Sequence, residues 1–200
     1  HATRTRTTFD IGVPYRGNTG STITDATSGA TVAHGLGSAP QVVIIKSRDS
    51  GLSWRSYFAP LGATHYIELD AAAAGVDAAN FMNDTAPTST VFSLGDGTTP
   101  NKNGDNYVAY CFSEKTGYSK FGGYTGNGNA NGPFVYTGFK PSFVLFKRTA
   151  GSAANWQLWD NKRDPDNPVE KALHPDIANT ASADQDIDFL SNGFKIRSNQ

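Results

Sequence analysis

The stretch Pro40-Gln-Val-Val-Ile-Ile-Lys46 recurs about one hundred residues later as Pro141-Ser-Phe-Val-Leu-Phe-Lys147, and this repetition decides the fold. The two prolines are 141 − 40 = 101 residues apart. A tryptophan follows at a similar distance in each copy, Trp54 in the first and Trp156 in the second. Short runs of apolar and β-branched residues are typical of buried strands. The sequence therefore predicts a tandem duplication, each copy having the size of a small β-sandwich.

Further runs of the same kind follow along the chain. Turn clusters such as Arg48-Asp-Ser-Gly51 separate them, as expected where the backbone reverses direction. The one helical candidate, Asp70–Asn83, is interrupted by Gly75, a poor helix former. We therefore predict an all-β fold of two tandem antiparallel β-sandwich repeats, jelly-roll or lectin-like. The predicted strands are Val42–Lys46, Tyr66–Leu69, Thr90–Leu94, Tyr107–Phe112, Phe134–Tyr136, Phe143–Lys147, Trp156–Asp160 and Phe194–Arg197.

Three regions are predicted along the chain. Residues 1–14 form an N-terminal extension, residues 15–123 the first β-sandwich repeat and residues 124–200 the second. The second repeat has no counterpart of the apolar strand Asp105–Phe112. A sandwich without such a strand has an unpaired sheet edge and a hole in its core. We therefore expect a truncated second repeat, either because the chain is a fragment or because another chain supplies the strand.

Composition excludes several classes of protein. Of the 200 residues, 17 are Lys or Arg and 18 are Asp or Glu, so the basic stripe of a general nucleic-acid binder is missing. No apolar run reaches the roughly 18 residues of a membrane span. The single cysteine, Cys111, excludes an intramolecular disulfide, and alternation groups it with Tyr107 and Ala109 as a buried structural thiol. We expect neither a nucleic-acid partner nor membrane insertion.

No catalytic or metal-binding motif is evident. The chain has no nucleophile elbow, zinc-binding HExxH helix or phosphate-binding loop, and its four histidines stand singly. Glu68 and Glu114 lie near predicted strands, and we interpret both as solvated positions. The oxygen-rich loops Asp96–Asp105 and Asp160–Asp166 lack the spacing of an EF-hand, and Asp and Asn are ordinary turn residues. We therefore expect no enzyme activity and no cofactor, with Ca²⁺ the one candidate ion.

Aromatic residues with polar neighbours are the candidate ligand contacts. Trp54 and Trp156 recur at the same place in both copies, which indicates a core role. Trp159 has no aromatic counterpart at the equivalent offset of the first copy, so it is the better candidate for an exposed contact. A flat ring beside Asp160 suits a sugar, although packing against a neighbouring repeat or subunit is the favoured use. The predicted ligand-binding residues are Trp159, Asp160 and Tyr57.

Four stretches carry a family resemblance: Tyr107–Gly128, Pro87–Phe92, Gly138–Pro141 and Asp188–Lys195. In combination they resemble the tandem repeat domain of marine, cyanophage-type bacteriophage virion proteins, which are structural or tail-fibre-like. The resemblance covers roughly residues 15–200. It implies a virion location, on the surface of an extracellular particle, and it implies neither a ligand nor a mechanism.

The resemblance and the architecture together lead to a functional expectation. We expect a non-enzymatic structural protein of a bacteriophage virion, first of all a tail-fibre or receptor-binding protein that contacts the host surface. Its expected partners are other virion proteins, copies of itself in a homo-oligomer, and a host cell-surface glycan. A rigid antiparallel frame that presents loops suits this role. Two alternatives stay open: a capsid-bound head fibre or decoration protein, and a secreted bacterial carbohydrate-binding module.

Overall fold

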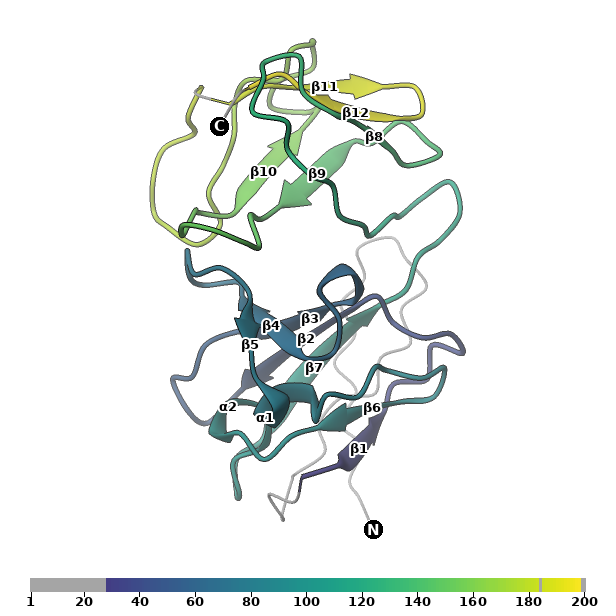
Figure 1. Ribbon diagram of the computed structural model, residues 1–200, viewed down its shortest axis with the longest axis vertical. Coiled ribbons are helices and arrows are strands. Elements are labelled where there is room, and N and C mark those ends of the chain that lie inside the picture. Colours follow the sequence, from purple (N-terminus) through teal and green to yellow (C-terminus); the bar gives the residue numbers. More distant parts are fainter. Residues whose placement is uncertain (1–27, 184, 199–200) are drawn as a thin grey trace. The chain divides into compact units, whose positions relative to one another are not determined.

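The computed structural model describes residues 28–183 and 185–198, which form antiparallel sheets with a few short helical turns (Figure 1). The predicted all-β class is confirmed. The chain divides into two compact units. Unit 1 consists of His1–Leu69 and Gly75–Glu114, and unit 2 of Asp70–Ala74 and Lys115–Gln200. The predicted extension, residues 1–14, lies outside the described residues.

Unit 1 contains a five-stranded sheet in the order β5-β4-β3-β2-β7. The strand β2 (Val42–Ser47) pairs with β3 (Arg55–Phe58) on one side and with β7 (Tyr107–Phe112) on the other. The sheet continues from β3 through β4 (His65–Glu68) to β5 (Val76–Asp77). Both edges of β2 are therefore occupied by strands of the same unit.

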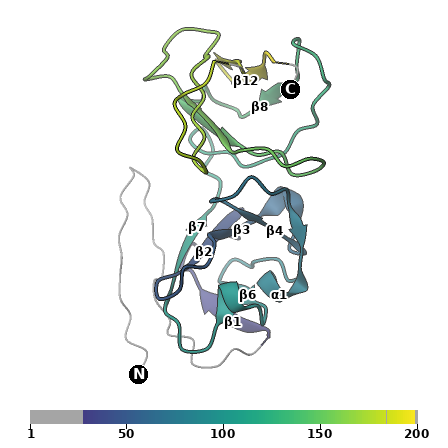
Figure 2. The ribbon, with the colours of Figure 1, turned by 90° about the vertical axis from the view of Figure 1, so that its left-hand side faces the viewer.

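A second layer of unit 1 packs on one face of this sheet (Figure 2). It consists of β1 (Ala30–Ala33), β6 (Val91–Leu94) and the helix α1 (Ala79–Met82). The core of unit 1 is formed by Val43, Ile45, Tyr57, Tyr66, Phe81, Met82, Phe92, Leu94, Tyr107 and Cys111. The predicted burial of Cys111 is confirmed, and this burial raises the pKa of its thiol to about 12.

Unit 2 contains a three-stranded sheet, β11-β12-β8, and a two-stranded sheet, β10-β9. In the first, β12 (Gly193–Ile196) lies between β11 (Ile187–Leu190) and β8 (Phe134–Tyr136). In the second, β9 (Phe143–Phe146) pairs with β10 (Gln157–Asp160). Residues of both sheets share one core, formed by Val144, Trp159, Val169, Ala172, Ile187, Phe189, Phe194 and Ile196.

Two strand pairs of unit 1 have equivalents in unit 2. Val43 lies opposite Tyr57 in unit 1, and Val144 lies opposite Trp159 in unit 2. The spacings are 144 − 43 = 101 and 159 − 57 = 102 residues. In the same way, β8 pairs with β12 as β1 pairs with β6. This agreement is what a duplication would produce, and the duplication itself stays a prediction.

All eight predicted strands are present, each within one residue at either end. The strands β1, β3, β5 and β11 were not predicted. The helical candidate is helical only over Ala79–Met82, and part of the remainder is β5. Two short elements add to the prediction, the helix α2 (Thr98–Asn101) and a 3-10 turn (Ala59–Leu61). Within the described ranges, no helix has the length and apolar character needed to cross a membrane.

Candidate functional site

Trp159 lies in the core of unit 2, with 0% of its surface exposed. Its ring stacks on Phe146 with the centroids 4.7 Å apart, and its Nε1–H donates to the Gln185 carbonyl at 3.2 Å. A fully buried ring has no face to offer a sugar or a partner. The prediction of an exposed contact at Trp159 is therefore wrong. The reason is its position on the strand, since Trp159 lies opposite the buried Val144.

Tyr57 is the aromatic counterpart of Trp159 that the sequence comparison overlooked. The spacing that relates Trp54 to Trp156, 156 − 54 = 102, also relates Tyr57 to Trp159. Tyr57 is 5% exposed and belongs to the core of unit 1, where burial raises its pKa. A core role was predicted for both Trp54 and Trp156, and burial supports it only at Trp156, which is 3% exposed, since Trp54 is partly exposed. Tyr57 and Trp159 are thus equivalent core residues of the two units.

The carboxylate of Asp160 is occupied by its own turn. Its Oδ1 accepts hydrogen bonds from the backbone N–H groups of Lys162 and Arg163, both at 2.9 Å, and its Oδ2 accepts one from Arg163 Nε at 2.6 Å. Burial raises the pKa of Asp160, but these hydrogen bonds outweigh it and the pKa is lowered overall. In the same loop, Asp164 Oδ2 accepts from the N–H of Glu170 at 2.8 Å. This loop therefore uses its carboxylates to hold its own shape.

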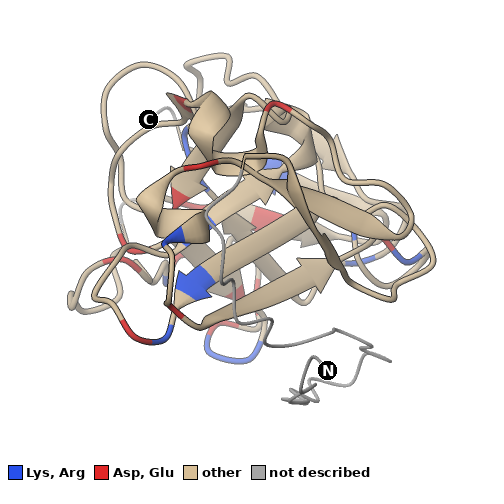
Figure 3. Cartoon of the chain, turned by 90° about the horizontal axis from the view of Figure 1, so that it is seen from below, with Lys and Arg blue, Asp and Glu red and all other residues tan. Residues whose placement is uncertain are grey.

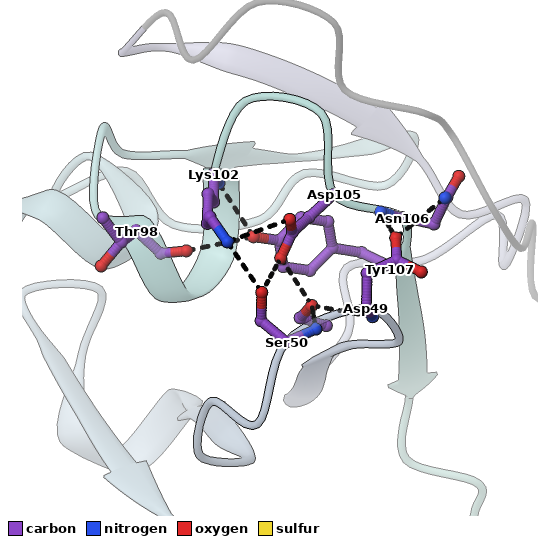
Figure 4. Close-up of polar contacts among 8 residues, drawn as sticks. Asp49, Ser50, Thr98, Lys102, Asp105, Asn106 and Tyr107 are labelled. Carbon is purple, nitrogen blue, oxygen red and sulfur yellow. Dashed lines mark hydrogen bonds and ion pairs between the residues drawn. The ribbon is translucent and has the colours of Figure 1, made fainter.

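The other oxygen-rich loop considered for Ca²⁺, Asp96–Asp105, ends in a charged network (Figure 4). Asp105 is 7% exposed, and its Oδ2 accepts hydrogen bonds from Ser50 Oγ at 2.6 Å and Ser47 Oγ at 2.9 Å. Lys102 Nζ lies 3.3 Å from Asp105 Oδ1. The Ser50 hydroxyl, with smaller contributions from Ser47 and Lys102, holds the pKa of Asp105 below its ordinary value despite desolvation.

Neighbouring polar groups extend this network along the start of β7 (Figure 4). The Tyr107 hydroxyl accepts from the Lys102 N–H at 2.8 Å and donates to the Thr98 carbonyl at 3.0 Å. Asp49 Oδ2 accepts from the Asn106 N–H at 2.5 Å and from its side-chain Nδ2 at 2.9 Å. The network ties the turn after β2 to β7. In the part of the chain that the structure describes, no group of three or more His, Cys, Asp or Glu could hold a metal ion.

Of the two glutamates considered for catalysis, Glu68 is placed differently from the prediction. Glu68 Oε1 lies 3.3 Å from Arg55 Nε, and each side chain is 20% exposed. The Arg55 guanidinium lies over the Tyr66 ring, 4.1 Å from its centroid. Glu68 is therefore a half-buried, paired carboxylate rather than the solvated one we expected. At Glu114, the backbone N–H donates to Gln41 Oε1 at 2.7 Å.

One serine–histidine contact was missed by sequence reasoning. His174 Nε2 lies 3.2 Å from Ser182 Oγ, and its Nδ1 lies 3.0 Å from the Trp156 carbonyl. A carbonyl can only accept, so Nδ1 donates to the Trp156 carbonyl, and the Ser182 hydroxyl is the partner of Nε2. Asp176 Oδ1 accepts a hydrogen bond from the Trp156 N–H at 3.1 Å. These contacts fasten the segment around residues 174–182 to the start of β10.

Exposed large apolar side chains are concentrated in unit 2. On β8, Phe134 is 45% and Tyr136 65% exposed, and on β9, Phe143 is 56% and Leu145 38% exposed. Tyr118, Tyr124 and Ile177 add to these, whereas among the described residues of unit 1 only Val76 belongs to this class. Aromatic residues on a surface are typical of protein interfaces. The exposed residues of β8 and β9 are therefore the candidate contact residues.

Positively and negatively charged residues are mixed along the described chain (Figure 3). In Figure 3, positions of both signs are interspersed along the ribbon, in keeping with the net charge of −1. A nucleic-acid-binding surface would instead gather cations on one face. The sequence does not separate the exposed strands β8 and β9 from buried ones, because Phe143-Val-Leu-Phe146 is apolar at every position and so is Val42-Val-Ile-Ile45 of the largely buried β2.

Comparison with known proteins gives one relationship. No curated protein and no solved structure matches the chain. The model of one family, described as a domain of unknown function (DUF7483), matches residues 4–200. A single family domain thus includes both predicted repeats. Because the match spans nearly the whole sequence, the chain belongs to the DUF7483 family.

Proposed function

We propose that this chain is a non-enzymatic structural protein of a bacteriophage virion and forms part of a tail fibre that contacts the host surface. The phage assignment rests on the sequence resemblance. The observation in the structure that carries a structural role is the set of exposed apolar side chains on β8 and β9. Such groups are stabilised when another protein covers them. The partners are therefore further virion proteins and copies of the same chain.

The placement of these side chains on paired strands supports assembly. Phe134 lies opposite Lys195 in the β8–β12 pair, and Phe143 lies opposite Asp160 in the β9–β10 pair. The backbone of both aromatic residues is already fixed by hydrogen bonding between strands. Binding a partner therefore costs little further conformational entropy. A host glycan, in contrast, is recognised in this proposal by the loops of the assembled fibre.

The state of the polar groups supports a role without catalysis. Asp105, Asp160 and Glu68 all serve ion pairs within their own unit. A catalytic acid instead needs a pKa raised toward neutrality, and the pKa values of Asp105 and Asp160 are lowered. These carboxylates are therefore suited to holding loops.

Immunogold electron microscopy tests the proposal directly. An antibody raised against the purified chain is applied to intact particles of the phage that encodes it, and antibody pre-absorbed with the chain is the control. We expect gold on the tail fibres. Gold over the head would overturn the fibre assignment in favour of a decoration protein, and the absence of specific gold would overturn the virion assignment.

A solution experiment separates the proposal from a secreted carbohydrate-binding module. The chain is analysed by sedimentation and against an array of bacterial surface glycans. We expect self-association that Tyr136→Ser weakens, because Tyr136 is the most exposed of the candidate contact residues at 65%. A stable monomer that binds a glycan would contradict the structural role.

A further inference from the structure

The strand β9 of unit 2 lacks a neighbour that its equivalent in unit 1 possesses. In unit 1, β2 pairs with β3 and also with β7. In unit 2, β9 pairs with β10 in the register of β2 and β3, and no second partner of β9 occurs among residues 28–183 and 185–198. An unpaired strand edge presents free N–H and C=O groups to any extended chain of matching length.

The backbone groups that face this edge belong to Phe143 and Leu145. Leu158 of β10 exchanges both backbone hydrogen bonds with Leu173, each at 2.9 Å, so its polar groups point away from β9. Leu145 lies opposite Leu158 and is therefore in a non-hydrogen-bonded pair of the β9–β10 ladder. By alternation, the N–H and C=O groups of Leu145 and Phe143 point to the open edge.

The side chains on this edge are exposed as well. Phe143 is 56% and Leu145 38% exposed. The equivalent residue of Phe143 in β2, at a spacing of 143 − 42 = 101, is Val42, which lies opposite Phe112 of β7 and is 3% exposed. The same strand position is thus covered in unit 1 and open in unit 2.

We propose that the open edge of β9 binds an extended segment of another polypeptide, antiparallel to β9 and apolar over its length as Tyr107–Phe112 is. The β2–β7 pair is the established interface that defines this occupant. By its register, the position of Phe112 lies opposite Phe143 and the position of Tyr110 opposite Leu145. Residues at the positions of Ala109 and Cys111 face the core side. This inference does not depend on the phage assignment.

The pairing within unit 1 excludes β7 of the same chain as this segment. The β7 strand is paired with β2 at all six of its residues, so within the described part of the chain it is already used. Two copies of β9 pairing with each other would make a shorter ladder, because β9 has four residues. They would also leave the core side without the side chains that Ala109 and Cys111 supply in unit 1.

A synthetic peptide with the sequence of Asp105–Lys115 is the probe. It carries a fluorophore, its thiol is kept reduced, and binding to the 200-residue chain is followed by anisotropy. In unit 1, Arg48 donates to the Asn106 carbonyl at 2.8 Å, so by alternation Tyr110 and Phe112 also turn their backbone groups toward β2. These two residues lie opposite Leu145 and Phe143 in the proposed register, and we expect N-methylation at Tyr110 and Phe112 to weaken binding at least about tenfold.

The matched control peptide is methylated at Ala109 and Cys111, whose N–H groups point away from the acceptor strand. It carries the same two methyl groups, and we expect it to bind within about threefold of the unmodified peptide, since a ladder bond lost is what costs affinity. Hydrogen exchange locates the bound peptide on the protein, and we expect exchange of the Leu145 amide proton to become slower on binding.

Two variants of the protein separate β9 from β2 as the acceptor. Leu145→Pro removes an N–H that faces the open edge and leaves the β9–β10 bonds in place, as proline is tolerated on edge strands. Leu145→Lys places a charge there, and Ile177→Lys is its control because Ile177 is 36% exposed in the same unit. We expect both Leu145 variants to lose binding at least about tenfold and Ile177→Lys to retain it.

Three outcomes would overturn the proposal. Equal binding of the two methylated peptides would mean that no ladder forms. Binding that persists in both Leu145 variants would place the peptide against β2, in exchange with β7. A dimer of the free chain that Leu145→Pro dissociates, with no peptide binding, would make a second copy of β9 the occupant. Circular dichroism and thermal melting confirm that each variant is folded.

Discussion

The strands β2 and β9 have equivalent partners on one side and differ on the other. Both pair with the next strand in the chain, β2 with β3 and β9 with β10. Within the part of the chain that the structure describes, only β2 has a further neighbour, β7, which comes from 60 residues later in the sequence, 107 − 47 = 60. A pair of strands close in sequence thus forms in both units, where the similar sequences recur. The further strand of the β2 sheet, in contrast, comes from a distant segment of the chain.

The largest effect is expected at the core position that the two units share. Trp159→Ala removes the largest fully buried side chain and should lower the free energy of unfolding of unit 2 by about 3–5 kcal/mol. Tyr57→Ala should have a cost of similar order in unit 1, because it lies opposite Val43 as Trp159 lies opposite Val144. Urea titration with backbone circular dichroism measures both.

Trp159→Phe is the control for this prediction. It keeps a ring for the stack on Phe146 and removes the hydrogen bond to Gln185, so it should lose less stability than the alanine variant. A cost below about 1 kcal/mol for Trp159→Ala is the typical result for a surface site. Such a small loss of stability would support the sequence-based prediction that Trp159 is exposed.

A glycine marks a second difference between the units. Gly193 begins β12, at the place that Val91 holds in β6. A Cβ on Gly193 would lie 2.2 Å from the Val135 carbonyl oxygen and 2.8 Å from the Phe134 ring. Gly193→Ala should therefore force β8 and β12 apart, at about 1–3 kcal/mol.

Gly122→Ala is the matched control for the close approach at Gly193. A Cβ there would meet nothing within 4 Å, so stability should change by less than about 0.5 kcal/mol. Thermal melting of both variants makes the measurement. Equal melting temperatures would mean that β12 does not approach β8 as closely as the pairing of Phe194 with Val135 indicates.

Local pattern predicted the apolar strands and failed where a polar side chain is satisfied by a distant partner. The strand Tyr107–Phe112 was predicted with its observed bounds because its six residues form an uninterrupted apolar run. The strand β3 was missed because Arg55 reads as polar, although Glu68 and the Tyr66 ring satisfy it. In β11, Asp188 interrupts the apolar run and is paired with Arg197.

The candidate site was harder to predict than the fold, because exposure depends on which strand lies next to which. Trp159 and Phe143 are both aromatic residues in predicted strands. Their pairing alone decides that Trp159 is buried and Phe143 exposed. The absence of a strand beside β9 in the described residues has no local sequence signal, since it is a property of the whole topology.

Low pH should reduce the stability of both units, because each contains a carboxylate whose hydrogen bonds stabilise a loop. The pKa of Asp105 and that of Asp160 are lowered from 3.8, so each contributes stability above that pH, and the contribution is lost as pH falls through the lowered value. Asp105→Asn should therefore reduce stability at pH 7 and flatten the loss of stability below about pH 4. Asp160→Asn should do the same through Arg163.

Melting temperature against pH, from pH 2 to pH 7, distinguishes the two networks. The Asp105 network joins the turn after β2 to β7, whereas the Asp160 network closes a single turn after β10. The Asp105 variant should consequently show the larger change. Identical acid profiles of wild type and Asp105→Asn would show that the pKa of Asp105 is the same in the folded and unfolded states, so that its network adds no pH-dependent stability.

The smallest effect on stability is expected at Tyr136, and this is what makes the residue informative. With 65% of its surface exposed, replacement by serine removes little buried area, so the free energy of unfolding should change by less than about 0.5 kcal/mol. Under the proposed function the same change weakens association, because a covered aromatic ring contributes to an interface and not to the isolated fold. A large loss of stability in Tyr136→Ser would assign the ring to the fold of unit 2. Unchanged stability together with unchanged sedimentation would remove Tyr136 from the contact residues and leave the open edge of β9 as the feature that distinguishes unit 2 from unit 1.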